Sequence, residues 1–149
     1  LLSAQIVDYF CSEAQDTACD VVAGVARHET VAEAYPQTRR TATQLEDGAY
    51  CGCNLFAFLT PQARQAAEFW RQIESHRKNP LRLIQVLGWG AVSRYLMGRL
   101  SLNDALDRIS HRLGFKAGAV VLTCPEAAVD VDSVSDLKLV QKIISRKQM

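Results

Sequence analysis

The sequence has no apolar run that approaches the roughly 20 residues needed to cross a membrane. It also lacks the charged and apolar opening segments of a secretory signal. Its 17 basic and 16 acidic side chains nearly cancel, so there is no basic surplus of the kind that binds nucleic acid. These absences predict a protein with no membrane partner and no nucleic-acid partner, and we expect it in the cytoplasm.

Cysteine is present, but not in a pattern that indicates a disulfide framework or a zinc site. The five cysteines are an odd number without regular spacing, which favours reduced thiols. Cys51 and Cys53 lie two residues apart, but no second pair of Cys or His follows at zinc-ligand spacing. We interpret the two as strand residues packed on one face of a sheet.

The apolar content and the order of the patterns predict the fold class. Apolar residues make up 48% of the 149 positions, which excludes a disordered tail and suits a single domain over residues 1–149 with one core. Apolar runs typical of buried strands alternate with helical patterns along the chain. This alternation predicts an α/β domain with a mixed, mainly parallel sheet flanked by helices.

Local signals give the expected boundaries of the elements. Asp47-Gly48 is a hairpin signal, and Ser3, Ser101 and Ser133 are predicted helix N-caps. We interpret the block 61–113 as a helical insertion packed over the sheet, with Trp89 and the leucines of the block in the core. Strands are predicted over 19–25, up to 45, over 50–59 and over 116–122, and helices over 3–13, 28–35, 61–78, 81–87, 91–100, 102–113 and 133–146.

An acidic stretch follows the last predicted strand. Asp130 and Asp132 alternate in an extended segment, so both are expected to project from one face. Two carboxylates beside a helix N-terminus suit a hard cation such as Mg²⁺ and its phosphate ligands. The alternative is a helix lead-in, because the helix dipole favours acids there and Ser133 with Asp136 has the spacing of a capping box. The residues alone leave both interpretations open.

Further candidates are basic or polar residues in or near predicted strands and loops. Arginine suits the forked recognition of phosphate, but two adjacent arginines on an extended segment point to opposite faces, and exposed solubilising charges are the alternative. Asn54 lies in an apolar strand and, if it is buried, must satisfy its amide through backbone neighbours or through a ligand. The basic break that follows the helix predicted over 61–78 either closes over phosphates or forms a solvated helix end. The basic candidates are Arg39, Arg40, Lys78 and Arg82.

Two motifs together carry a resemblance to a known family. Residues 47–56 read D-G-x-Y-x-G-x-N-L-F, and residues 130–137 read D-x-D-x-x-x-D-L. The pair resembles the NTP-transferase family, which includes the molybdenum-cofactor cytidylyl- and guanylyltransferases and has a GT-A-type fold. The resemblance runs from the first residue to about Lys147.

The resemblance implies a Mg²⁺-dependent nucleotidyltransferase. Such an enzyme transfers a nucleotidyl group from CTP, GTP or another NTP to a phosphorylated or hydroxyl acceptor, a small cofactor- or sugar-like molecule, and releases pyrophosphate. It implies that Asp132, assisted by Asp130, holds the metal and that Gly52 and Asn54 position the acceptor. The phosphate contacts it suggests are Arg39, Arg40, Lys78 and Arg82.

The chain opens on Leu1-Leu2-Ser3, which resembles the end of the family's D-x-P-L-L segment. The chain is thus similar to the C-terminal part of such an enzyme, without its glycine-rich nucleotide loop, and we expect it to be inactive by itself. One alternative is a GT-A-type glycosyltransferase, which uses a D-x-D triplet to hold the metal of a nucleotide sugar. Another is a non-catalytic fragment that binds a ligand or a partner. The sequence leaves open the acceptor, the NTP and whether the protein is an oligomer.

Overall fold

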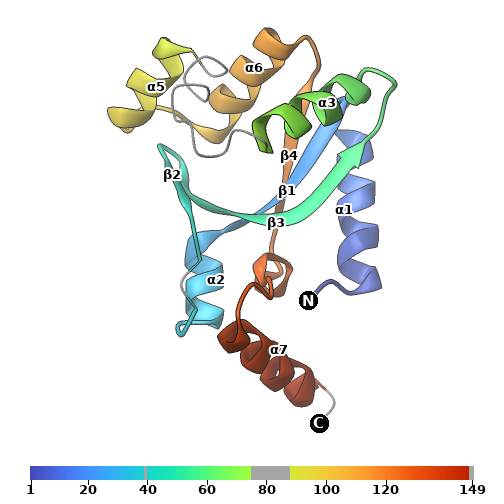
Figure 1. Cartoon of the computed structure of the whole chain (residues 1–149), viewed down its shortest axis with the longest axis vertical. Helices are drawn as coiled ribbons and strands as arrows, with labels where there is room; N and C mark the ends of the chain where they lie inside the picture. Colours follow the sequence, from blue (N-terminus) through green and yellow to red (C-terminus); the bar gives the residue numbers. More distant parts are fainter. Residues whose placement is uncertain (39, 75–87, 148–149) are drawn as a thin grey trace.

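The computed structural model describes residues 1–38, 40–74 and 88–147. Its elements form a four-stranded sheet with helices around it (Figure 1). The elements are α1 (Ala4–Asp16), β1 (Val21–Arg27), α2 (His28–Ala34), β2 (Thr43–Leu45), β3 (Gly48–Phe58), α3 (Ala63–Glu74), α5 (Trp89–Leu96), α6 (Leu102–Leu113), β4 (Ala117–Leu122), the 3-10 helix η1 (Pro125–Ala128) and α7 (Val134–Lys147).

The sheet is mixed and has the strand order β2-β3-β1-β4. β1 pairs in parallel with β4 and antiparallel with β3, which in turn pairs antiparallel with β2. The predicted α/β class with a mixed sheet flanked by helices is therefore confirmed. The expectation that the sheet is mainly parallel does not hold among the described strands, where one pairing is parallel and two are antiparallel, because the hairpin at Asp47-Gly48 adds β2 and β3 next to β1.

Short-range side-chain bonds fix the starts of two helices where the sequence predicts caps. The Ser3 hydroxyl accepts a hydrogen bond from the Ile6 amide at 3.3 Å at the start of α1. The Ser101 hydroxyl accepts one from the Asp104 amide at 3.1 Å at the start of α6. Each bond satisfies one of the amide groups that a helix N-terminus leaves without an intrahelical partner.

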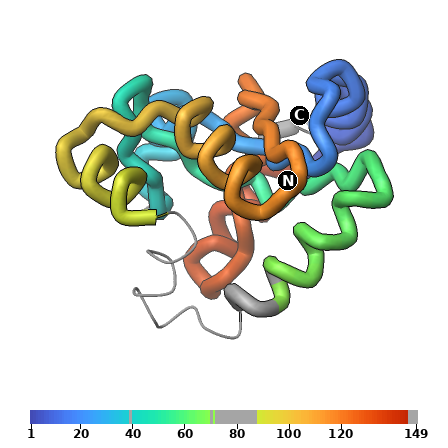
Figure 2. Tube along the Cα trace, turned by 90° about the horizontal axis from the view of Figure 1, so that it is seen from above, coloured from blue at the N-terminus to red at the C-terminus, as the bar shows by residue number. Residues whose placement is uncertain are grey.

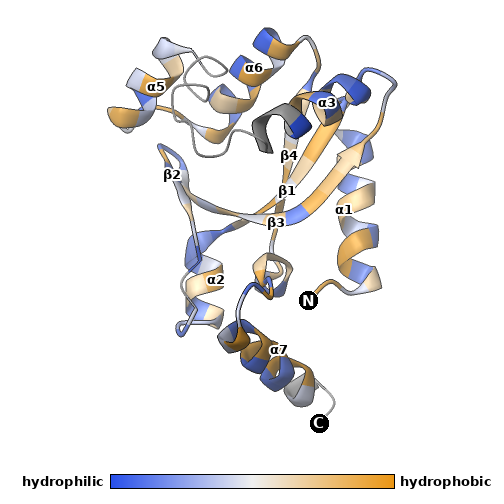
Figure 3. Cartoon of the chain, viewed as in Figure 1, coloured by the Kyte–Doolittle hydropathy of each residue, from blue (hydrophilic) through white to orange (hydrophobic). Residues whose placement is uncertain are grey.

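The core lies between one face of the sheet and the first two helices. α1 presents Ile6, Phe10 and Ala14 to this face, and α2 contributes Val31. β1, β4 and most of β3 are apolar (Figure 3), so burial of their side chains provides the main stabilisation of the sheet. The buried strand residues of the cluster are Val22, Ala26, Cys51, Cys53, Val120 and Leu122.

Apolar side chains on the opposite face of the sheet are more exposed within the described part of the chain. Phe56 and Phe58 pair with Ala23 and Val21 in the register of β1 and β3, and they are 44% and 54% exposed. The expectation that Trp89 is a core residue is wrong, because its side chain is 74% exposed. α5 instead buries the small residue Ala91.

Apart from α1, which runs alongside the sheet, the helices gather at its two ends (Figure 1). α3, α5 and α6 lie at the end where β1 and β4 begin, and α2, η1 and α7 lie where those strands finish (Figures 1 and 2). None of the helices within residues 1–38, 40–74 and 88–147 is long and apolar enough to span a membrane. The segment predicted as a helix over 81–87 lies outside the described residues. The remainder of the predicted insertion, 61–113, contains α3, α5 and α6.

Candidate functional site

Asp130 lies beyond the carboxyl ends of the two parallel strands. β1 and β4 run in register, and the chain leaves β4 through η1 into the acidic loop. Three buried residues before Asp130 (Ala127, Ala128 and Val129) anchor this loop against the core. The Asp130 side chain itself remains 34% exposed. In open α/β sheets this end of the strands is where ligands bind.

Asn54 reaches Asp130 from an irregularity in β3. The pairing with β1 shifts at this point, so that Gly24 alone stands opposite the three residues from Cys53 to Leu55. Asn54 has a φ of 51°, a left-handed conformation that asparagine tolerates better than most residues. Its side-chain amide donates a hydrogen bond of 2.6 Å to Asp130 Oδ2. The bulge therefore turns an otherwise apolar strand toward the acidic loop, as bulges near functional sites commonly do.

Gly24 permits this bulge because it has no side chain. A Cβ at position 24 would lie 3.1 Å from the Cβ of Leu55, closer than nine in ten contacts of this kind, so one of the two segments would have to shift. On the bulged strand itself, Gly52 is exposed, and a Cβ there would meet no atom within 4 Å. The backbone at Gly52 is thus open on the same strand that carries Asn54.

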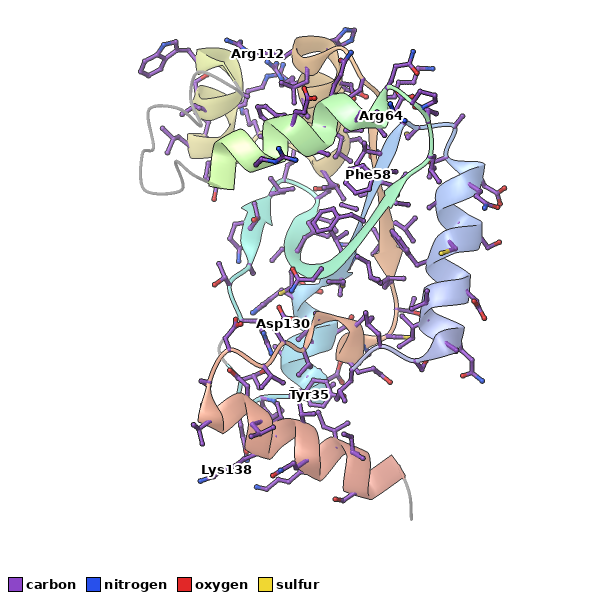
Figure 4. The ribbon with its side chains drawn as sticks, turned by 45° about the vertical axis from the view of Figure 1, so that its right-hand side comes forward. Tyr35, Phe58, Arg64, Arg112, Asp130 and Lys138 are labelled. Carbon is purple, nitrogen blue, oxygen red and sulfur yellow. The ribbon has the colours of Figure 1, made fainter. Side chains whose placement is uncertain are left out.

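Arg40 holds the same loop from the segment between α2 and β2. Its Nη2 donates a 2.7 Å hydrogen bond to the backbone carbonyl of Asp130, and its Nη1 lies 3.9 Å from Asp130 Oδ2. The Arg40 side chain is only 13% exposed, and its buried Nε has no hydrogen-bond partner in the described part of the chain. The structure thus brings Arg40, Asn54 and Asp130 together (Figure 4 labels Asp130), although 76 and 90 residues separate Asp130 from the other two.

The acids that follow Asp130 have different surroundings. The Ser133 hydroxyl bonds Asp136 Oδ2 at 2.6 Å and accepts a hydrogen bond from the Asp136 amide at 3.3 Å. This hydroxyl is the main reason that the pKa of Asp136 is lowered, and the positive charge of Arg40 and the amides of Asp132 and Ser133 add to the effect. Asp136 therefore serves the start of α7, as the capping-box spacing predicts. Asp132 is exposed, and no hydrogen bond or ion pair occupies its carboxylate among the described residues.

The donor set at the acidic loop fits Mg²⁺ in part. The carboxylate of Asp132 and one carboxylate oxygen of Asp130 have no protein partner in the described part of the chain. No group of three or more His, Cys, Asp or Glu side chains that could hold a metal occurs among these residues. Mg²⁺ characteristically takes only one or two carboxylates and completes its shell with water and substrate phosphates. A dedicated all-protein metal cage is not what this loop offers.

The two strand cysteines are buried in the core on one face of the sheet, as the sequence predicts. All five cysteines are free. Burial, reinforced by Cys51 and Asp130, raises the pKa of Cys53 to about 12, and burial also raises the pKa of Cys51. A thiol must lose its proton to ligate a metal or to attack an electrophile. Neither cysteine is prepared for such chemistry.

An open hollow of about 480 Å³ borders the acidic loop on the side of α7. Lys138 and Lys142 line it, one turn apart on α7, and neither ammonium has a hydrogen bond or ion pair to another described residue (Figure 4 labels Lys138). The sequence analysis missed these lysines. Their spacing on a predicted helix was the available signal, because residues four apart share a face. The other lining residues are Gln37, Thr38, Ser133, Ser135, Asp136 and Leu139.

Three of the predicted phosphate contacts, Arg39, Lys78 and Arg82, lie outside the described residues. Arg40 is engaged with Asp130, so its role as a phosphate contact stays a prediction. The roles predicted for Asp132, Asp130, Gly52 and Asn54 likewise remain predictions, although the contact between Asn54 and Asp130 joins the two motifs of the sequence.

Comparison with solved structures finds a protein of similar fold. A hypothetical transferase from Thermus thermophilus superposes with a TM-score of 0.80 at 33% sequence identity. The match covers 91% of this chain and 58% of that one, so the chain spans little more than half the length of its structural neighbour. No family model and no curated protein matches the sequence.

Proposed function

We propose that this chain is part of a Mg²⁺-dependent nucleotidyltransferase. The observation that carries the proposal is the hydrogen bond between Asn54 and Asp130. The family resemblance implies that the motif at 47–56 positions the acceptor and that the motif at 130–137 holds the metal. Nucleotidyl transfer requires the acceptor and the metal-bound nucleotide to lie next to each other. The contact between Asn54, at the bulge in β3, and Asp130, in the loop after β4, supports such a meeting of two segments 76 positions apart. The similarity to a hypothetical transferase supports the broader class.

In this proposal an acceptor oxygen attacks the α-phosphorus of an NTP such as CTP or GTP. A new oxygen–phosphorus bond forms, the bond to the β-phosphate oxygen breaks, and pyrophosphate leaves with its electron pair. Bound Mg²⁺ would neutralise charge on the phosphates and orient them. Asp132 would hold the metal with the help of Asp130, while Asn54 and the open backbone at Gly52 would orient the acceptor.

The surroundings of the loop favour an anionic acceptor. Lys138 and Lys142 face the adjoining hollow without protein partners in the described part. Two ammonium groups near one cavity attract phosphate or carboxylate. An acceptor that carries such a group would be held on the α7 side while its reactive oxygen points toward the acidic loop.

The test replaces Asp132 by Asn in the full-length protein. We expect the melting temperature without Mg²⁺ to stay nearly unchanged, because Asn is as good as Asp beside a helix start, within roughly 1 kcal/mol. Mg²⁺-dependent pyrophosphate release from CTP or GTP, assayed over a panel of phosphorylated acceptors, should fall by at least roughly a hundredfold.

Asp136→Asn is the matched control, because it makes the same chemical change four residues away in the capping bond. It should lower stability and leave the activity of the folded protein intact. Equal turnover in the wild type and Asp132→Asn at limiting Mg²⁺ would contradict the metal role. Release of a nucleoside diphosphate from a nucleotide sugar, in place of pyrophosphate from an NTP, would identify the glycosyltransferase alternative.

A further inference from the structure

The two oxygens of the Asp130 carboxylate are in different situations. Oδ2 accepts the 2.6 Å bond from Asn54 and lies 3.9 Å from Arg40 Nη1. No hydrogen bond or ion pair of a described residue reaches Oδ1. A carboxylate held by one oxygen and open at the other has the arrangement of a metal ligand with a supporting partner behind it.

Arg40 is an unusual neighbour for a cation-binding carboxylate. Its permanent positive charge opposes a nearby Mg²⁺, although the same charge interacts favourably with the carboxylates of Asp130 and Asp136. The guanidinium is nearly buried, and burial of such a group is costly unless it is hydrogen-bonded. Its shorter contact is to the Asp130 backbone carbonyl at 2.7 Å, not to the carboxylate. Arg40 therefore fixes the backbone from which Asp130 projects.

We propose that Arg40 is a positioning residue that, together with Asn54, presents Asp130 Oδ1 to the divalent cation. Asn54 fixes the rotation of the carboxylate through Oδ2, and Arg40 fixes the loop through the carbonyl. This inference rests on the proposed function and departs from the interpretation of Arg40 as a direct phosphate contact.

The experiment measures binding of Mn²⁺, used as a spectroscopic substitute for Mg²⁺, to the full-length protein without nucleotide. Arg40→Lys keeps the charge but loses the planar fork, and should weaken Mn²⁺ binding roughly tenfold, as is typical for residues that support a metal ligand. Asn54→Ala should weaken it to a similar degree. The Mn²⁺ affinity of the double variant should fall by less than the product of the two single-variant fold-changes, because both residues hold the same carboxylate.

Arg40→Gln separates positioning from charge, because it removes the charge and keeps an amide donor. If Arg40 acted only through its charge, Arg40→Gln would bind Mn²⁺ more tightly than the wild type and Arg40→Lys would bind it equally well. Arg94→Lys is the matched control, since Arg94 forms an exposed ion pair of 3.7 Å with Asp104. It should leave Mn²⁺ binding unchanged. Melting temperatures without metal show whether each variant is folded.

Several results would overturn the inference. The inference is wrong if Arg40→Lys binds Mn²⁺ as tightly as the wild type. Tighter Mn²⁺ binding by Arg40→Gln, with no change in Arg40→Lys, would show that Arg40 acts only through its charge. A loss of CTP and GTP binding by Arg40→Lys in excess EDTA would make Arg40 a phosphate contact instead. If the wild-type protein binds no Mn²⁺, the proposed metal site itself fails, which is a different outcome from a wild type that binds and an Arg40→Lys that binds equally.

Discussion

Cys53 illustrates how the interior near the site controls the chemistry of a single residue. Its thiol is almost wholly buried, and burial is the main reason that its pKa rises to about 12. The charges of Cys51 and Asp130 add to this effect. The cysteine next to Asn54 in sequence is therefore a small apolar core residue, and Asn54 and Asp130 make the polar contact.

We predict that Cys53 resists thiol reagents in the folded protein. At pH 8, site-resolved mass spectrometry after brief labelling should find the exposed Cys11 modified and Cys53 unmodified. The raised pKa also makes folding depend on pH. The Cys53 contribution should be complete below the ordinary thiol value of 9.0 and decline as pH rises from there toward 12, because the unfolded chain loses the proton first. Rapid native-state labelling of Cys53 would contradict the prediction.

At the scale of one element, the bulge in β3 converts a core strand into part of the candidate site. Asn54 has a positive φ, and its side chain bonds Asp130. Backbone conformation and side-chain contact are thus separate contributions at one position. Substitutions that change one without the other can distinguish them.

Asn54→Ala and Asn54→Gly should both lose the bond to Asp130, but they should differ in stability. Alanine is strained at a φ of 51°, and glycine is not. Urea unfolding should therefore give Asn54→Ala a free energy of unfolding roughly 1 kcal/mol lower than Asn54→Gly.

Gly52→Ala is a useful companion on the same strand. Its new Cβ meets nothing within 4 Å, so unfolding should be nearly unchanged. If the backbone at Gly52 faces the acceptor, the affinity for acceptor should nevertheless fall.

For the Asn54 variants, equal stability of Asn54→Ala and Asn54→Gly would contradict the prediction, because it would show that the bulge relaxes when the Asn54 side chain is lost.

At the scale of the whole molecule, the sheet has a stabilising contact at the end opposite to Asp130. Asp20 accepts a 2.5 Å bond from the Thr60 hydroxyl and a 2.7 Å bond from the Lys116 amide. It thereby ties the start of β1 to the residues after β3 and before β4. The Thr60 bond is the main cause of its lowered pKa, followed by the Lys116 amide.

Asp20→Ala should lower stability at neutral pH and leave Mn²⁺ binding by the folded protein unchanged, because Asp20 lies at the opposite end of the strands from Asp130. The pKa of Asp20 is depressed in the folded state, so its charge-dependent contribution is present above the ordinary value of 3.8 and lost as pH falls through the folded value. The difference between wild type and variant, measured by thermal unfolding, should shrink over that range. A difference independent of pH would show that the carboxylate charge contributes nothing.

The sequence by itself determined the features that depend on residues close together in the chain. Serine at N-cap spacing gave the starts of α1 and α6 because the bond spans three residues. The Asp47-Gly48 turn and the apolar strands likewise follow from local patterns, and their alternation with helices gave the α/β class. These interactions form wherever the chain adopts the local geometry, so they can be predicted from the sequence without knowledge of the tertiary structure.

Only the tertiary structure decided what the polar residues contact. Arg40 and Asn54 meet Asp130 across 90 and 76 residues, and the meeting depends on a bulge and on the absence of a side chain at Gly24. The sequence alone predicts that Arg40 contacts phosphate and that Asn54 contacts a ligand. Trp89 is a large apolar residue and is therefore expected in the core, but in the folded chain its side chain is exposed. A side chain's type sets which bonds it can make, while the packing of distant segments sets which partners lie within reach.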